Sequence, residues 1–124
     1  PVHYASAGGA ITSFLDRMFF AGKENMVYKP GAAVVSCRRA GSTATLDQLN
    51  KYFTISSMPL VGSSYWNMVH GNTPEEVLQD KEGLQTMRNL ARNMAWLLHC
   101  IEAGKKAGIS VPQPESGSTT NFIR

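Results

Sequence analysis

The chain contains 124 residues, of which 43% are hydrophobic and 17% charged, and it carries a net charge of +3. This length suits one domain with a hydrophobic core and argues against several domains. The basic residues are scattered from Arg17 to Arg124 without forming a run, so the charge pattern does not favour a nucleic-acid partner.

The first third of the chain predicts the end of a strand, a helix and a second strand. PVHYA, residues 1–5, reads as the tail of a strand. A helix is predicted from Ser6, as its cap, to about Gly22, because one apolar stripe follows at helical spacing: Ile11, Phe14, Leu15, Met18 and Phe19. The apolar run from Ala32 to Ser36 fits a parallel strand that is buried on both faces.

The middle of the chain repeats this order. Thr45 to Gln48 has the spacing of a capping box, which predicts a helix that runs to about Thr54. Leu60 to Ser63 is apolar and then polar, and it is predicted to be the next strand.

Two helices are predicted near the C-terminus. Thr73 followed by Pro74 marks the cap and first position of a short helix. After Asp80 a long helix is predicted from an apolar stripe, and Lys105, Lys106 and Gly108 close it. The stripe consists of Leu84, Met87, Ala91, Met94, Leu98 and Ile101, and it is widened by Leu90, Leu97 and Trp96. From residue 111 the chain is polar and without period, so we expect a loosely held tail.

The alternation of strands and helices is typical of an α/β protein with an open parallel sheet. Ligands bind such sheets at the carboxyl ends of the strands. Three such ends are predicted here: Pro1 to Ala5, Ser36 to Thr43 and Ser63 to Asn67.

The cysteines and the absence of apolar spans indicate the cellular setting. Cys37 and Cys100 lie far apart and lack metal-ligand spacing, so we expect reduced thiols and no metal site. No apolar stretch reaches the length of a membrane span, and residues 1–9 lack the order of a signal peptide. We therefore expect a cytoplasmic protein with no membrane partner.

The residues at the three strand ends suggest some chemistries and exclude others. Cys37 beside Arg38 and Arg39 suggests a nucleophilic thiolate, although a small buried residue at a strand end is the more common role. Neither the P-loop nor the dinucleotide fingerprint occurs in the sequence. A loop rich in small residues, Ser36 to Thr43, offers backbone donors and two guanidiniums, which suits a planar ring that bears oxygens. The aromatic residues at the other ends fit either ligand contact or ordinary packing.

Three of these segments together resemble a known family. PVHYASAGGAITSFLDR, GAAVVSCRRAGST and PLVGSSYWN, with the closing TNFIR, are similar to the flavodoxin-like NAD(P)H-dependent FMN reductases and NAD(P)H quinone oxidoreductases. The resemblance implies a five-stranded parallel sheet with helices on both faces and FMN at the carboxyl ends of the strands. It also implies a homodimer or homotetramer whose subunits share the site.

The resemblance assigns roles to particular residues. Pro1, Val2, His3 and Tyr4 would border the isoalloxazine ring, with His3 at a position where Tyr is more usual. The polar edge of the ring would be wrapped by Ser36, Cys37, Arg38, Arg39 and Gly41. Tyr65 and Trp66 would lie further out, toward the flavin of a neighbouring subunit. The cofactor carries the chemistry in this family, so no catalytic acid or base is assigned.

Members of the family carry two further strand–helix units and most of a third strand before the segment that resembles PVHYA. Those units include the loop that grips the FMN phosphate. We therefore expect residues 1–110 to be the C-terminal portion of a single flavodoxin-like domain, with residues 111–124 as its tail. Such a portion, on its own, is expected to associate, either through an exposed sheet edge or with the missing half of the domain.

The expected function is that of an FMN-binding oxidoreductase. Hydride would pass from NAD(P)H through the flavin to a quinone, a flavin or a similar small-molecule acceptor. The alternative is a flavodoxin-like electron-transfer or interaction module without its own substrate, including an iron-sulfur flavoprotein. A hydrolase that uses Cys37 ranks below both.

Overall fold

A computed structural model describes residues 1–122; Ile123 and Arg124, which end the TNFIR segment, lie outside the described residues. The elements in chain order are β1 (Val2–His3), β2 (Ser6–Ala7), α1 (Gly9–Gly22), the 3-10 turn η1 (Lys23–Asn25), β3 (Val35–Cys37), α2 (Ser42–Ile55), β4 (Met68–His70), α3 (Pro74–Val77) and α4 (Lys81–Lys106). Among residues 1–122, no helix combines the length and apolar content that a membrane crossing requires.

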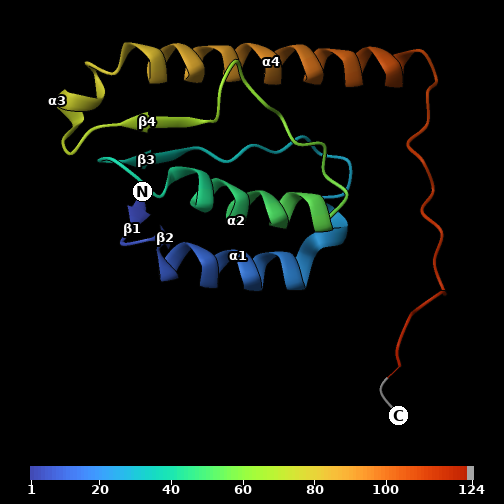
Figure 1. Ribbon diagram of the computed structural model, residues 1–124. Helices are drawn as coiled ribbons and strands as arrows, with labels where there is room; N and C mark the ends of the chain where they lie inside the picture. Colours follow the sequence, from blue (N-terminus) through green and yellow to red (C-terminus); the bar gives the residue numbers. More distant parts are fainter. Residues whose placement is uncertain (123–124) are drawn as a thin grey trace.

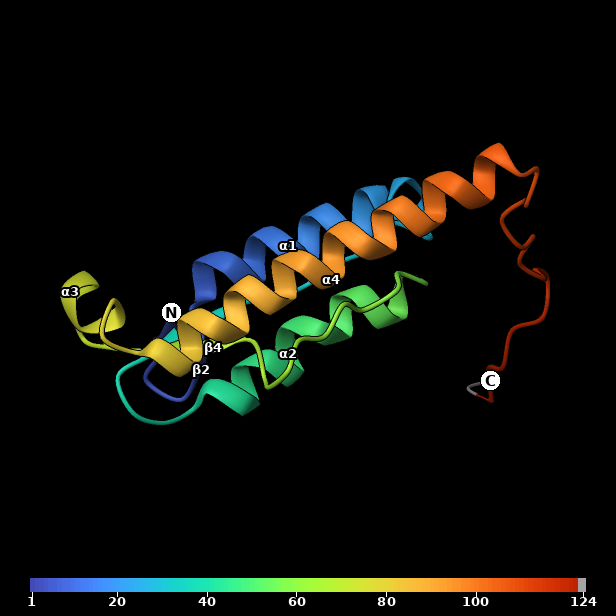
Figure 2. The same ribbon diagram turned by 90° about the horizontal axis from the view of Figure 1, so that it is seen from above.

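The centre of the fold is a parallel pair of strands between two layers of helix. β3 and β4 run parallel, with Val35 opposite Met68 and Cys37 opposite His70. Helix α4 lies on one side of this pair, and α2 and α1 lie on the other (Figure 1). Seen from above, α1 and α2 run on either side of α4 (Figure 2). The mixed α/β architecture with helices on both faces is therefore confirmed.

The wider parallel sheet that the sequence predicted is not seen in the described residues. β1 pairs with β2 in an antiparallel hairpin, and β3 pairs only with β4. The short strands reflect the sequence, because each apolar run ends after a few residues in serine, glycine or a charged side chain. The fold is thus consistent with a flavodoxin-like arrangement, with a small sheet.

The core forms where α2 covers the strands. Ala33, Val35, Leu46 and Met68 are buried together, with Val2, Leu49 and Phe53 packed against them. Burial of such side chains supplies most of the favourable free energy of folding.

Helix α1 joins this core through an aromatic cluster. The ring of Phe19 lies 5.6 Å from that of Tyr52 and 6.2 Å from that of Phe53. The hydroxyl of Tyr52 also donates to the carboxylate of Asp16. This hydrogen bond raises the pKa of Tyr52, because ionisation would remove the shared proton and set two negative charges side by side.

Two predicted helix starts were wrong. The capping box at Thr45 lies inside α2, which begins one turn earlier with Gly41 as its N-cap. The buried Thr45 hydroxyl instead donates to the carbonyl oxygen of Gly41 at 2.8 Å. Ser6 belongs to β2, and the N-cap of α1 is Gly8. The predicted cap at Thr73 is confirmed, because its hydroxyl accepts from the backbone N–H of Glu76.

The long helix was predicted with the correct bounds and a partly wrong face. Asp80 caps α4 at its N-terminus, and Lys105 and Lys106 lie in its last turn. Leu90 from the predicted stripe is buried, but so are Gly83 and Thr86, which the stripe did not include. Leu98 and Trp96 from the stripe are 49% and 68% exposed. The prediction favoured the largest side chains, but the helix approaches β4 through small ones.

The predicted strand from Leu60 to Ser63 was also wrong. The partner of Gly31 is Leu60, 29 positions later, whereas the partner of Val35 is Met68, 33 positions later. The segment from Leu60 to Met68, which we call the edge strand, is therefore four residues longer than the segment from Gly31 to Val35 that it faces. The extra residues loop away from the pairing. They belong to what we call the edge loop, Gly62–Trp66, which follows a single bridge at Leu60 and precedes β4.

Asn67 closes the gap that the edge loop leaves. Its side-chain Nδ2 donates to the backbone carbonyl oxygens of Ala33 at 3.1 Å and Val61 at 3.5 Å. The backbone carbonyl oxygen of Asn67 accepts from the N–H of Val35 at 2.9 Å. Asn67 is 8% exposed, so these groups would otherwise be buried without partners. The amide thus replaces the missing rungs of the ladder.

Helix α4 fastens the edge loop from the other side. The hydroxyl of Ser63 donates to the carbonyl oxygen of Thr86 at 2.6 Å. The side-chain amides of Asn89 and Asn93 donate to the Ser64 hydroxyl and to the Gly62 carbonyl oxygen, each at 2.9 Å. The loop is therefore held by residues on successive turns of α4, through the backbone carbonyl of Thr86 and the side chains of Asn89 and Asn93.

The chain leaves the helical layers after α4. All residues from 107 to 122 are exposed, and within them there is no helix or strand. Figure 1 shows this segment running away from the end of α4.

Replacing Asn67 with Asp should destabilise the protein by about 1–3 kcal/mol, because two buried carbonyl oxygens lose their donor. Urea unfolding at neutral pH measures the loss. Asn72→Asp at an exposed position is the matched control and should change the free energy of unfolding little. Equal effects of the two variants would contradict the role given to Asn67.

Candidate functional site

The first predicted loop is a tight hairpin. Val2 pairs with Ala7 and His3 with Ser6, so Tyr4 and Ala5 form the turn. Tyr4 adopts a positive φ of 59°, and the N–H of Ala5 donates to the carbonyl oxygen of His3 at 2.8 Å. Val2 packs against the core, whereas Pro1, His3 and Tyr4 are exposed. The hairpin therefore presents an imidazole and a phenol ring to solvent.

The second predicted loop follows the carboxyl end of β3. Cys37 is 5% exposed and its carbonyl oxygen accepts from the N–H of Gly71 at 3.0 Å. Ser36 is half-buried, and the next two side chains, Arg38 and Arg39, are exposed. Within residues 1–122 neither guanidinium forms an ion pair. Both remain available to a ligand.

The two loops meet at Gly41. This residue has a φ of +88°, and a Cβ built on it would lie 2.9 Å from Cγ1 of Val2 and 3.7 Å from the carbonyl oxygen of Ala5. The hairpin is also tied to α2, because the N–H of Ala7 donates to Oε1 of Gln48 at 3.2 Å. Glycine is therefore required at this position by both the backbone conformation and the close approach.

The start of α2 adds hydrogen-bond donors to this place. Gly41 has no side chain with which to cap the helix, so the N–H groups of the first turn, residues 42–44, have no partner within the helix. The positive end of the helix dipole and the guanidiniums of Arg38 and Arg39 lie on the same short loop. The arrangement suits a ligand rich in carbonyl or anionic oxygens.

Cys37 is a buried residue at the end of a strand, and its position does not suit a nucleophile. Its side chain is buried, and among the described residues its thiol makes no hydrogen bond to a histidine or any other base. A thiolate nucleophile requires access and an activating neighbour. The structure provides neither, so the hydrolase interpretation has no support.

Tyr65 and Trp66 have neighbours different from those of the first two loops. They lie on the edge loop, with ring centroids 4.9 Å apart at an interplanar angle of 65°. Each is more than half exposed. With residues of α2 they line a pocket of about 560 Å³. The chain thus brings together Pro1–Tyr4 and Ser36–Gly41, and it places the aromatic pair beside a separate pocket.

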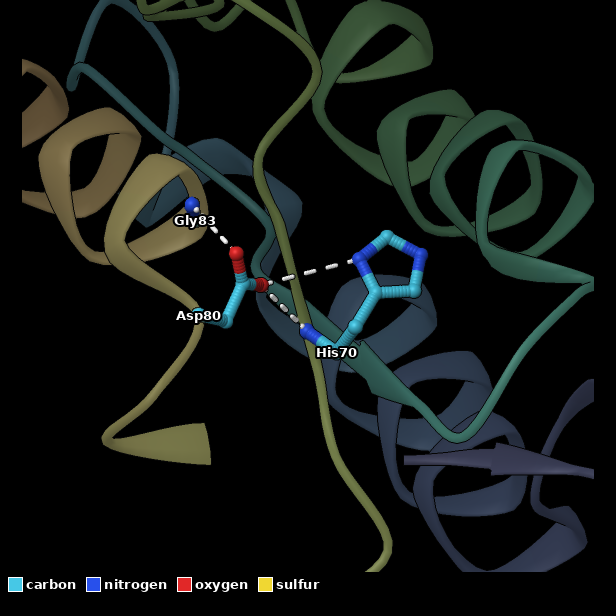
Figure 3. A network of polar contacts seen from close by, with 3 residues as sticks. All are labelled: His70, Asp80 and Gly83. Carbon is cyan, nitrogen blue, oxygen red and sulfur yellow. Dashed lines mark hydrogen bonds and ion pairs between the residues drawn. The ribbon is translucent and has the colours of Figure 1, made fainter. Parts of the chain in front are cut away.

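The carboxyl end of β4 carries a polar network that the sequence did not reveal (Figure 3). Oδ2 of Asp80 accepts from the backbone N–H of His70 at 2.7 Å and lies 3.6 Å from Nδ1 of its ring. Oδ1 of Asp80 accepts from the N–H of Gly83 at 2.9 Å. The sequence predicted only part of this network. Asp80 stands before a predicted helix, but its pairing with His70 depends on the position of β4, which the sequence placed wrongly.

These donors lower the pKa of Asp80. The N–H of Gly83 contributes most, followed by the N–H of His70 and the charge and hydrogen bonding of its ring. Each favours the ionised carboxylate over the neutral acid. Among residues 1–122, no group of three or more His, Cys, Asp or Glu side chains is placed to hold a metal ion.

The stability that Asp80 contributes should depend on pH in the acid range. Its pKa is lower in the folded than in the unfolded state, so the contribution is complete above the unfolded value of about 3.9 and is lost as pH falls through the folded value. Asp80→Asn keeps a capping oxygen without the charge. Urea unfolding should show a stability difference between the wild type and this variant that shrinks below about pH 4. A difference that is constant with pH would contradict the assignment.

Comparisons with known proteins identify the family of the chain. Residues 1–73 match the NADPH-dependent FMN reductase family, which is more than half of the chain. An iron-sulfur flavoprotein of Methanocaldococcus jannaschii is 32% identical over 75 residues, which cover 56% of this chain and 39% of that protein. No solved structure matches the chain at a significant level. The matched region contains both loops that meet at Gly41, and the chain belongs to the NADPH-dependent FMN reductase family.

Proposed function

We propose that the chain forms part of an FMN-binding oxidoreductase that takes hydride from NAD(P)H and passes electrons to a quinone, a flavin or a similar small acceptor. The observation that carries the proposal is the meeting of the hairpin and the loop after β3 at Gly41, within the region that matches the family. The chain spans 39% of the length of the curated relative, so the activity of the whole protein is part of the proposal.

The chemistry of the loop fits one edge of a flavin. Isoalloxazine presents carbonyl oxygens and ring nitrogens along its polar edge, and a donor-rich loop complements them. The uncapped start of α2 and the guanidiniums of Arg38 and Arg39 would face that edge, with Ser36, Cys37 and Gly41 supplying backbone groups. Pro1, Val2, His3 and Tyr4 would border the ring from the hairpin. When bound, FMN supplies the redox chemistry, so we assign no catalytic acid or base.

The donor set also has a consequence for the potential of the cofactor. Fixed positive charge and N–H dipoles stabilise negative charge that develops beside them. Arg38, Arg39 and the start of α2 would therefore favour the reduced, more electron-rich state of a bound flavin. The role of this chain is to bind and orient the ring and to stabilise its charge.

A second candidate is an electron-transfer module, including an iron-sulfur flavoprotein. The relative from Methanocaldococcus jannaschii carries that name, which favours this candidate. The chain has two cysteines, of which Cys37 is buried and Cys100 lies exposed on α4. A four-cysteine cluster would therefore need ligands from outside this chain.

The intact protein should bind FMN with a change in flavin absorbance and fluorescence. Gly41→Ala should weaken binding at least about tenfold, because the left-handed φ is unfavourable by about 1–2 kcal/mol for alanine and the added Cβ meets Val2. Gly62→Ala is the matched control, since a Cβ there has no neighbour within 4 Å. Arg38→Gln, on an exposed side chain, tests the same site without a backbone change.

Circular dichroism of each variant separates loss of binding from loss of folding. Absence of FMN binding by the intact wild type would refute the proposal. Steady-state oxidation of NADH and NADPH with a quinone acceptor then separates the two candidates, because an enzyme turns over alone whereas a carrier requires a partner reductase. Iron analysis of the same protein tests for a cluster.

We also propose that the protein assembles from two or four copies. Helix α1 exposes large apolar side chains, with Phe14 59% and Phe20 92% exposed, beside the charged pair Asp16 and Arg17. A two-fold axis would place opposite charges against each other across such a face. Light scattering should give the mass of two or four chains for the wild type and a lower mass for Phe20→Glu. Phe122→Glu is the control in the exposed tail, and a monomeric wild type would refute the proposal.

A further inference from the structure

A pocket of about 560 Å³ lies between α2 and the edge loop, apart from the loops that meet at Gly41. Its volume is in the range of small-molecule sites, about 300–1,000 Å³. Its lining consists of Leu46, Asp47 and Asn50 from α2 and of the continuous segment from Leu60 to Asn67. Among residues 1–122, no lysine or arginine lines it.

One wall of the pocket is aromatic and held in place. The rings of Tyr65 and Trp66 contact each other edge to face, and both remain more than half exposed. The loop that carries them is fastened to α4 through Ser63, Asn89 and Asn93. A surface ordered before binding loses little conformational entropy when a flat ligand stacks on it.

The polar groups of the pocket include two acceptors without donors. Nδ2 of Asn67 is committed to two carbonyl oxygens, which fixes the orientation of the amide and leaves its Oδ1 as an acceptor. Among residues 1–122 that oxygen has no hydrogen-bond partner, and the same holds for Oδ1 of Asn50; both atoms are enclosed by the protein. Because the two asparagines line the pocket, their oxygens place partial negative charge beside it without contacting a ligand directly.

A carboxylate completes the set. Asp47 is exposed on the first half of α2, and within residues 1–122 it forms no ion pair, even with Lys51 one turn further along. The pocket therefore offers one negative charge, with two enclosed amide oxygens beside it, whereas the loop at Gly41 offers donors and positive charge. The two places have opposite ligand preferences.

We propose that this pocket binds a flat aromatic ring that carries cationic N–H donors, of the aromatic amidine or aminopyridinium class. The ring would stack on Trp66, and its cationic donors would pair with the carboxylate of Asp47. The proposal does not depend on the flavin function, because no residue from the two loops that meet at Gly41 lines the pocket.

Benzamidine is the probe, titrated into the intact, isotope-labelled protein, with benzoate as the ring-matched anion. Benzamidine should shift the indole N–H signal of Trp66 and the side-chain amide signals of Asn50 and Asn67 in a saturable manner, and benzoate should not. Asp47→Asn should weaken benzamidine binding about tenfold, since a charged hydrogen bond is lost. Glu24→Gln, which removes a charge on η1 outside the pocket, is the control and should leave binding unchanged.

Two results would overturn the proposal. One is equal binding of benzamidine and benzoate, or shifts confined to residues outside the pocket. The other is loss of benzamidine binding in the presence of saturating FMN, which would assign the aromatic pair to a flavin. If the intact protein fails to bind FMN but binds benzamidine with the expected loss in Asp47→Asn, the pocket stands and only the flavin function is refuted.

Discussion

The side-chain amide of Asn67 holds the centre of this fold together. The edge strand leaves β3 after Leu60 and rejoins it at Met68, and parallel strands cannot lose several rungs inside a core without leaving polar groups unpaired. The amide satisfies the carbonyl oxygens of Ala33 and Val61 at that gap. Because the gap is closed, Met68 can join the buried cluster beneath α2, and β4 can continue to His70.

The position of α4 follows from the same detour. The edge loop meets three turns of α4 through serine and asparagine side chains, and Asp80 ties the start of that helix to the end of β4. Hydrogen bonds from polar side chains therefore hold α4 on this face, and the small residues Gly83 and Thr86 allow the helix to approach closely. On the opposite face, α1 and α2 pack through aromatic rings instead.

The sequence predicted helices well and strands poorly, for physical reasons. Helical spacing is a local pattern, so the end of α1, the bounds of α4 and the cap at Thr73 could be read directly. The strand β4 could not, because it depends on Asn67, whose importance arises from pairing with Ala33, 34 positions earlier. The start of α2 was misplaced by one turn because Gly41 is dictated by contact with Val2, a tertiary constraint.

The candidate flavin loops could be predicted together, because PVHYA and SCRRAGST are continuous segments at strand ends. The network of His70 and Asp80 and the pocket beside Trp66 could not, since both depend on where the edge strand rejoins the sheet. Residues that act through long-range pairing carry no local sequence signal. Their identification required the register of β4.

The hydrogen bonds along the outer edge of β4 also affect how the protein associates with other chains. Along a parallel strand, alternate N–H groups point to opposite sides. On the side that faces β3, Asn67 accepts from the N–H of Val35, and the N–H of Gly71 donates to Cys37. The N–H groups of Met68 and His70 on the other side already donate to the carbonyl oxygen of Trp66 and to Asp80. A sheet edge whose donors are occupied is a poor template for a foreign strand. The fold thus resists edge-to-edge aggregation on the β4 side.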